Sequence, residues 1–285
     1  MKRVAIVGLG LMGGSLGLAL KRGGAAHVAA YARRAETRRY ALAQGAADEA
    51  FDTPAEAVRN ADVVVICTPV RSIPALAGEC RTSMKAGCVV TDVGSTKEEV
   101  VRGMEALFRD GRQHFVGSHP MAGSEKTGME AARADLYRNA VVAVTPSAAS
   151  SEQAVRAVMD LWTSVGARAI GLDAKEHDRL VARTSHLPHL VAACLVASVG
   201  RELSGEVRGF CGTGFRDTTR IASGSADLWR DIVETNRAAV LAELQGCSKE
   251  LQDVIAIIEK GDFEGLRVYL ERARAVREKL VGAAG

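Results

Sequence analysis

The 285-residue sequence lacks an excess of charge, a membrane-length apolar run and any pair of cysteines spaced as C-x-x-C. Its 37 Lys and Arg residues and 34 Asp and Glu residues leave a net charge of only +3, without a long run of either sign. Nucleic-acid backbones are bound by a basic stripe, and a membrane span needs roughly 18 to 20 apolar residues. We therefore expect neither nucleic acid nor a membrane as a partner.

The cysteines are scattered through apolar or helical segments. Disulfide frameworks and structural zinc sites instead use cysteines at close, regular spacings. We expect buried free thiols, no metal site and a cytoplasmic location. The cysteines are Cys67, Cys80, Cys88, Cys194, Cys211 and Cys247.

The N-terminus superficially resembles a secretory signal peptide, because Lys2 and Arg3 precede seventeen uncharged residues, 4–20. Five glycines lie within this stretch. Each glycine costs a helix about 0.8 to 1 kcal/mol, so the stretch fits a helical export signal poorly.

Short β-branched runs alternate with helical patterns in the first half of the chain. This alternation is typical of a parallel sheet with crossover helices, and the runs are apolar on both faces, as buried parallel strands are. The sequence predicts an α/β fold in which residues 1–171 form a Rossmann-type, doubly wound sheet. The expected strands are 4–7, 27–31, 62–67, 88–92, 140–145 and 167–170.

Beyond residue 171 the strand patterns end, and we expect an all-helical domain over residues 172–285. Helical periodicity runs near 174–203, 227–259 and 262–281. Apolar residues from 227 onward recur mostly at spacings of three, four and seven, which gives an apolar stripe on helices too long to bury it alone. We expect a second copy of the chain to cover it, in a homodimer; a helical bundle complete within one monomer is the alternative. The stripe comprises Leu228, Ile232, Leu241, Leu244, Leu251, Val254, Ile255 and Ile258.

A glycine-rich segment, 8–13, directly follows the first expected strand and opens a helix, which is the context of a dinucleotide-binding turn. The first glycine permits a tight turn, and the second lets backbone N–H groups approach a pyrophosphate at the helix N-terminus. The third allows the helix to pack closely on the strand. The residues expected to contact the cofactor here are Gly8, Gly10, Leu11, Met12 and Gly13.

The end of the second expected strand bears on the choice between NAD and NADP. Ala32 stands where NAD-binding domains carry an acidic residue for the ribose hydroxyls, and Arg33 and Arg34 follow it. A 2′-phosphate would meet two guanidinium groups instead of a repelling carboxylate. This favours NADP over NAD. The alternative is a solvated loop in which Arg33 stacks on adenine.

Two polar segments, 92–97 and 117–125, follow strands whose carboxyl ends should face the nicotinamide. We expect His119 to lie in a loop of small residues, where a neutral imidazole can accept a proton from a substrate hydroxyl near pH 7. His27 and His114 adjoin strands, and we expect them to be structural.

Taken together, these segments resemble the prephenate dehydrogenase family, including its arogenate and cyclohexadienyl dehydrogenase relatives, over nearly the whole chain. The resemblance implies a tyrosine-biosynthesis enzyme that oxidises and decarboxylates a cyclohexadienol, with hydride passing from ring C4 to the nicotinamide. It extends through the glycine-rich turn, 92–97, 117–128, Ser-His-Leu-Pro-His at 185–189, 212–222 and Trp-Arg-Asp at 229–231.

The resemblance also implies residue roles. His119 would deprotonate the C4 hydroxyl, and Ser95 would hydrogen-bond between substrate and cofactor. Arg220 would bind a substrate carboxylate, for which a guanidinium offers a bidentate contact. The remaining expected contacts are Ser124, Glu125, His189 and Trp229 with the substrate, and Arg33, Arg34, Thr68 and Pro69, with Ser95, for the cofactor.

Pro188 should kink its helix and aim His189 inward. For His186 a structural role is equally compatible with the sequence. Arg216 and Asp217 could form a local ion pair, so they receive no role.

Three alternatives stay open. Prephenate and arogenate differ in a keto or amino side chain, and no residue decides between them. A β-hydroxyacid dehydrogenase opens with a similar glycine turn, but its G-x-x-x-K-x-x-x-N lysine motif has no match here. A non-catalytic NAD(P)-binding sensor would not need His119, Ser95 and Arg220.

Overall fold

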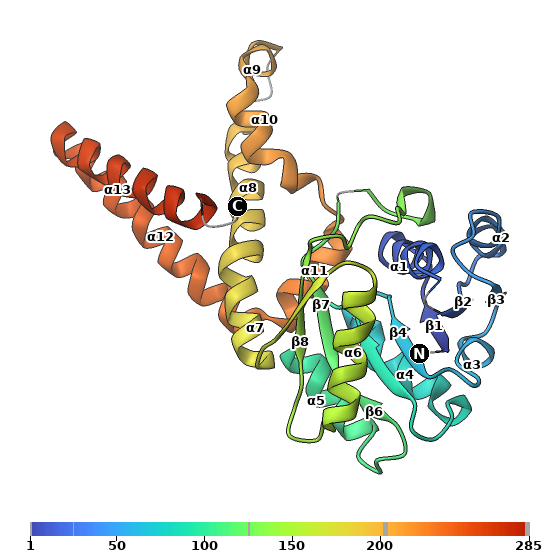
Figure 1. The fold of residues 1–285 in the computed structure, drawn as a ribbon. Coiled ribbons are helices and arrows are strands. Elements are labelled where there is room, and N and C mark those ends of the chain that lie inside the picture. Colours follow the sequence, from blue (N-terminus) through green and yellow to red (C-terminus); the bar gives the residue numbers. More distant parts are fainter. Residues whose placement is uncertain (1, 25, 125, 202–204, 283–285) are drawn as a thin grey trace. The chain divides into compact units, whose positions relative to one another are not determined.

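The computed structural model describes residues 2–24, 26–124, 126–201 and 205–282 (Figure 1). Its contacts group into two compact units, Met1–Arg237 and Ala238–Gly285. The change from sheet to helix falls after residue 171, but a domain boundary there stays a prediction.

The main sheet of the first unit has six parallel strands in the order β3-β2-β1-β4-β5-β6. This is the strand order of a doubly wound, Rossmann-type sheet, so the expected fold class is confirmed. The register places the ends of β1, β2, β4 and β5 at one edge, because Val7 pairs with Tyr31 and Ile66, and Ile66 pairs with Asp92. The strands are β1 (Arg3–Val7), β2 (His27–Tyr31), β3 (Glu49–Phe51), β4 (Val63–Ile66), β5 (Val89–Asp92) and β6 (His114–Phe115).

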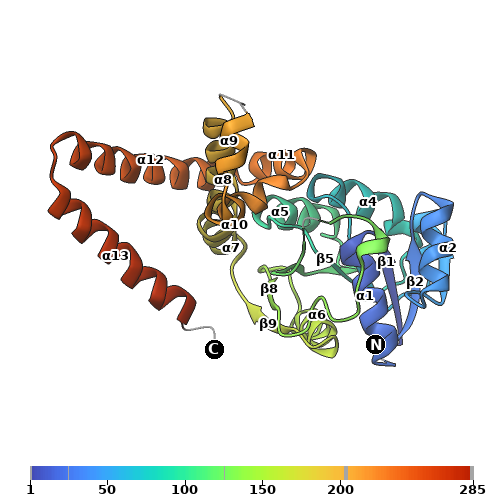
Figure 2. The same ribbon diagram turned by 90° about the horizontal axis from the view of Figure 1, so that it is seen from above.

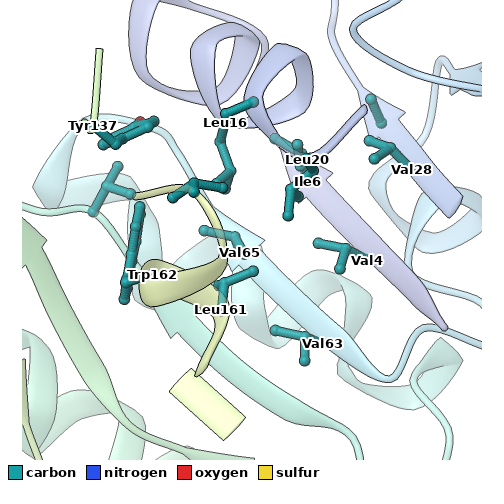
Figure 3. Packing of buried hydrophobic residues seen from close by; sticks show 14 of the residues in the cluster. Val4, Ile6, Leu16, Leu20, Val28, Val63, Val65, Tyr137, Leu161 and Trp162 are labelled. Atoms are coloured by element: carbon teal, nitrogen blue, oxygen red, sulfur yellow. The ribbon is translucent and has the colours of Figure 1, made fainter. Parts of the chain in front are cut away.

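Two hydrophobic cores cover the two faces of this sheet, because successive strand residues point to opposite sides. Val4 and Ile6 join one core, and Ala5 and Val7 join the other. Figure 3 shows the first core, in which Trp162 packs near these strands. Figure 2 shows α4 and α5 on one side of the sheet and α6 on the other. The helices of this region are α1 (Leu11–Arg22), α2 (Ala35–Ala43), α3 (Pro54–Ala57), α4 (Ile73–Cys80), α5 (Glu98–Leu107) and α6 (Glu152–Ser164), with 3-10 turns at Val70–Ser72, Arg81–Ser83 and Met129–Ala131.

A second sheet corrects the expectation of one parallel sheet. It contains β7 (Gly117–Pro120), β8 (Val141–Thr145) and β9 (Arg168–Gly171), with β7 antiparallel to β8 and β8 parallel to β9. His119 therefore lies in a strand, opposite Ala143, and not in a loop. Glycine and proline are poor strand formers, so β7 shows no strand pattern in the sequence, and its pairing with β8 decides its conformation.

The chain after β9 is helical, as expected, but with more interruptions than the periodicity suggests. The expected segment 227–259 is broken at Asn236, whose backbone leaves the helical region at φ −126° and ψ 32°. The segment from 174 contains a π-helical turn directly before Leu187 and Pro188. The elements are α7 (Ala174–Val181), the π turn η4 (Ala182–His186), α8 (Leu187–Val199), α9 (Gly205–Phe210), α10 (Thr213–Thr219), the 3-10 turn η5 (Arg220–Ser223), α11 (Ala226–Thr235), α12 (Arg237–Glu259) and α13 (Phe263–Gly282).

The stretch Ala174–Val199 is long and apolar enough, by length and composition, to cross a membrane. The expectation from the sequence concerned uncharged runs, whereas this criterion admits up to two charged residues in its window. The indication is weak, since core helices of folded proteins meet the same criterion. Only 28% of its most apolar window is buried, so much of this apolar surface is exposed in the single chain.

The second unit contains most of α12 together with α13. The two helices meet at a turn that includes Gly261, at φ +65°, and they diverge from it in Figure 2. The Tyr269 hydroxyl donates to Glu250 Oε2 at 3.1 Å, which links α13 to α12. Large apolar side chains remain exposed on both helices, among them Leu251 at 62% and Phe263 at 70%.

Candidate active site

The glycine-rich turn between β1 and α1 has the geometry of a dinucleotide cradle. Gly8 adopts φ +111°, and a Cβ there would lie 2.7 Å from the carbonyl oxygen of Cys67. A Cβ on Gly13 would lie 1.9 Å from the Gly8 carbonyl oxygen, so α1 can approach the turn only with glycine there. A Cβ on Gly10 would meet no protein atom within 4 Å. The first and third glycines therefore serve packing, whereas the space beside the second is open to a ligand.

The N-terminus of α1 offers hydrogen-bond donors at this open space. Gly10 is the N-cap and makes no side-chain cap hydrogen bond, and no acidic residue lies in the first turn. The first N–H groups of a helix have no partner within the helix, and the helix dipole favours an anion there. Leu11 and Met12, both partly exposed, are thus placed to meet a pyrophosphate.

The loop after β2 carries the arginines expected to contact the adenosine end of the cofactor. Arg33 and Arg34 are both exposed. The Arg38 guanidinium donates to the carbonyl oxygens of Ala32 at 2.8 Å and Arg33 at 3.0 Å, which holds the loop in shape.

Thr68 and Pro69 follow β4 at the same edge of the sheet. Ser72 Oγ donates to the Pro69 carbonyl oxygen at 2.7 Å and lies 3.0 Å from Thr68 Oγ1. The predicted cofactor residues thus come from the ends of β1, β2 and β4, as they do in dinucleotide-binding sheets.

A cavity of about 520 Å³ lies within the first unit, and it gathers most of the predicted substrate residues. Side chains from both sheets and from the helical segment contribute to its wall. Glu125 lies outside the described residues. The predicted residues that line the cavity are Ser95 after β5, His119 on β7, Ser124 after β7, His189 on α8, Arg220 on η5 and Trp229 on α11.

The ring of His119 is hydrogen-bonded, on the side away from the cavity, to His177, a residue that the sequence analysis missed. Its Nδ1 lies 2.9 Å from Nε2 of His177, and Nδ1 of His177 lies 2.8 Å from Oδ1 of Asp178. His177 and Asp178 are adjacent on α7, where an ordinary helical pattern conceals them. Burial, together with the neighbouring His177, Lys97 and His186, holds the pKa of His119 well below its usual value. The imidazole is therefore neutral, and able to accept a proton, at pH 7.

A buried ion pair lies beneath the site. Lys97 Nζ contacts Asp92, and both side chains are fully buried. Lys97 also donates to the Ser118 carbonyl oxygen at 3.0 Å, while Asp92 Oδ1 accepts the Ser118 N–H at 3.1 Å. Burial lowers the pKa of Lys97, although Asp92 opposes the shift. The polar segment 92–97 thus mainly anchors the start of β7, and only Ser95 from it lines the cavity.

The π turn before Pro188 places two more histidines in the cavity wall. The His189 ring stacks on Trp229 with centroids 3.5 Å apart, and His186 meets the edge of Trp229 at 5.9 Å. Nδ1 of His189 is buried and has no hydrogen-bond partner among the described residues. Burial lowers the pKa of His186 to about 4. The role of His186, open at the level of sequence, is thus that of a neutral wall residue.

A doubly wound sheet with a pyrophosphate cradle, next to a cavity that contains a neutral histidine, defines a nicotinamide-dependent dehydrogenase. Comparison with known families agrees. Residues 16–171 match the nucleotide-binding domain of prephenate dehydrogenase, and residues 173–272 match its dimerization domain. The chain belongs to the prephenate dehydrogenase family and is an NAD(P)-dependent enzyme. The second match supports oligomerisation through the C-terminal part.

Individual relatives are similar over most of their length. A prephenate dehydrogenase of Bacillus subtilis is 34% identical over 97% of this chain and 76% of its own. A cyclohexadienyl dehydrogenase of Zymomonas mobilis is 31% identical over 97% of this chain and 95% of its own. The crystal structure of Aquifex aeolicus prephenate dehydrogenase with hydroxyphenyl propionate and NAD⁺ has a TM-score of 0.91 at 31% identity, covering 98% of each chain.

The cradle yields a prediction that separates packing from ligand binding. Gly13→Ala should lower the free energy of unfolding by about 1 to 3 kcal/mol, because its methyl group overlaps the Gly8 carbonyl oxygen. Gly10→Ala should change stability by less than about 1 kcal/mol but weaken NAD(P) binding, because its methyl group enters the open space. Urea denaturation and cofactor titration measure the two effects. Equal losses of stability, or undiminished cofactor affinity in Gly10→Ala, would contradict this division of roles.

Proposed function

We propose that the protein catalyses the oxidative decarboxylation of prephenate to 4-hydroxyphenylpyruvate, a step of tyrosine biosynthesis. The observation that carries the proposal is the neutral His119, which lines the cavity and is fixed through Nδ1. The family match and the relatives named above support the substrate class. A bound nicotinamide would supply the hydride acceptor.

In the proposed reaction the C4 hydroxyl of the substrate gives its proton to Nε2 of His119 while the C4 hydrogen leaves as hydride. The ring carboxylate then departs as carbon dioxide, and the electron pair of the broken bond completes the aromatic ring. A positioned base contributes about 10² to 10⁴ in rate. Ser95, from the loop after β5, would hydrogen-bond to the same hydroxyl.

Arg220 and the ring pair of His189 and Trp229 would bind the rest of the substrate. Prephenate is a dianion, and a guanidinium forms a bidentate, charge-assisted contact with a carboxylate. The stacked rings of His189 and Trp229 give a flat wall for the six-membered ring. Arogenate, which carries an amine in place of the keto group, is the alternative substrate.

Initial rates of NAD(P)H formation test the substrate and the base together. We expect turnover of prephenate to exceed that of arogenate, and His119→Asn to lower kcat by about 10² to 10⁴ while cofactor affinity is unchanged. His114→Asn, on β6 outside the cavity, is the matched control and should keep full activity. If the enzyme turns over arogenate but not prephenate, arogenate is the substrate. If His119→Asn keeps full activity, His119 is not the base.

For the cofactor we propose NADP in preference to NAD, supported by Ala32 at the end of β2 and by the exposed Arg33 and Arg34. Replacing both arginines with alanine should raise the KM for NADP about 10- to 100-fold, because charge-assisted hydrogen bonds contribute about 1.5 to 3 kcal/mol. The KM for NAD should hardly change. Arg39→Ala, farther along α2, is the control. A wild-type preference for NAD, or an equal rise in the KM for both cofactors, would favour the alternative, a solvated loop in which Arg33 stacks on adenine.

We further propose a cytoplasmic homodimer formed through the C-terminal helices. The six free cysteines support the location, although the expectation that all are buried is wrong: Cys80 and Cys88 are buried and Cys194 is exposed in the single chain. The exposed apolar residues of α12 and α13 support the dimer. Light scattering should give twice the 30.1 kDa of one chain. Leu251→Glu combined with Ile255→Glu should yield monomers, whereas Leu42→Glu, at an exposed leucine of α2, should not. A monomeric wild-type protein would refute the proposal.

A further inference from the structure

The side chains of His119, His177 and Asp178 form a continuous hydrogen-bonded row that the proposed reaction has so far used only at its outer end. His177 is 1% exposed and Asp178 is 2% exposed, so neither reaches the cavity that His119 lines. The two links measure 2.9 Å and 2.8 Å. Both are within the range of good hydrogen bonds.

The surroundings of Asp178 determine the direction of every hydrogen bond in this row. Its Oδ1 accepts the backbone N–H of Lys97 at 2.7 Å, and its Oδ2 accepts the N–H of Glu98 at 2.9 Å, where α5 begins. Backbone N–H groups can only donate, and a helix N-terminus favours a negative charge, so Asp178 is an ionised acceptor.

The ionised Asp178 fixes the donor and acceptor roles of His177, and His177 in turn fixes those of His119. Nδ1 of His177 must carry a hydrogen to donate to Asp178, which leaves Nε2 of the neutral ring as an acceptor. Nδ1 of His119 therefore donates to His177. The lone pair of His119 lies on Nε2, the nitrogen on the far side of the ring from His177. This is the tautomer that a base in the cavity requires.

We propose that His119, His177 and Asp178 act as a proton relay, in which His177 and Asp178 are positioning residues for His119. The proposal rests on the proposed function for the source of the proton, the substrate hydroxyl. When Nε2 of His119 takes that proton, its Nδ1 proton passes to Nε2 of His177. One proton enters and one moves inward, so the positive charge ends on His177 against the carboxylate of Asp178.

The charged neighbours explain why an inward transfer helps. Lys97 and His186 face His119 and disfavour a positive charge on its ring, as does burial. Asp92 neutralises Lys97, and His189 faces His186. Asp178 presents its negative charge to the row and contacts His177 directly. Asn236 donates to the Asp178 carbonyl oxygen at 2.7 Å and keeps this part of α7 in place.

Two substitutions of His177 separate tautomer control from proton transfer. His177→Leu removes the acceptor for His119 Nδ1, and we expect kcat to fall about 10²-fold, with KM and cofactor affinity within about twofold. His177→Gln can accept that hydrogen bond through its amide oxygen but cannot take up a proton. We expect the kcat of His177→Gln to be about tenfold higher than that of His177→Leu. His114→Gln is the control for the same exchange outside the cavity and should leave kcat unchanged.

The pH profile provides a readout that a purely structural role would not move. In the wild type, kcat should fall at acid pH as the relay becomes protonated. Without His177 the carboxylate of Asp178 no longer stabilises that proton through the row, so the acid limb of His177→Gln should move to lower pH. Urea denaturation checks that both variants are folded. Variants that keep the wild-type kcat and acid limb would overturn the relay.

Nitrogen NMR of ¹⁵N-histidine-labelled protein, without substrate, tests the relay independently of the reaction. The His119 resonances, identified by their loss in His119→Asn, should show the Nδ1–H tautomer in the wild type and in His177→Gln, and a mixture in His177→Leu. An Nε2–H tautomer in the wild type would overturn the relay. The expected tautomers in an enzyme that turns over neither prephenate nor arogenate would support the relay and reject the proposed function.

Discussion

The buried contact between Asp92 and Lys97 is the interaction on which the site depends. Both side chains are fully buried, and breaking such a pair by removing one partner generally costs about 3 to 5 kcal/mol. The pair ties the end of β5 to Ser118, next to His119, and the backbone N–H of Lys97 holds Asp178 on α7. One short segment after β5 therefore fixes the base from two directions. The desolvation of these charges is offset because nearly every polar atom among them has a partner.

Interruptions of the helices place the remaining functional groups. The π turn Ala182–His186 precedes Pro188, whose ring lacks an N–H for the helical ladder, and it aims His186 and His189 at Trp229. Asn236 ends α11 and uses its side chain to contact Asp178 and His186. A continuous α-helix through residues 182–188, or through Asn236, would not make these contacts. The breaks are therefore part of how the cavity is built.

The site combines parts that the sequence reveals to different degrees. His119 stands out as a histidine among small residues after a strand, and Arg220 and Trp229 stand out through the family resemblance. His177 and Asp178 show no such signal, because a histidine and an aspartate near the start of an amphipathic helix are ordinary. Their importance comes only from the packing of α7 against the start of α5, far away in the sequence.

The sequence by itself determined the doubly wound class of the main sheet, through the apolar runs of β1, β2, β4 and β5, and the dinucleotide cradle. Both follow from local rules, since buried parallel strands require apolar runs and the turn at Gly8 and Gly13 tolerates no side chain. Only the tertiary structure decided that Gly117–Pro120 is a strand, that it belongs to a separate sheet, and that His177 stands behind His119. These features depend on pairing with β8 and on hydrogen bonds between distant segments, and neither leaves a periodic pattern along the chain.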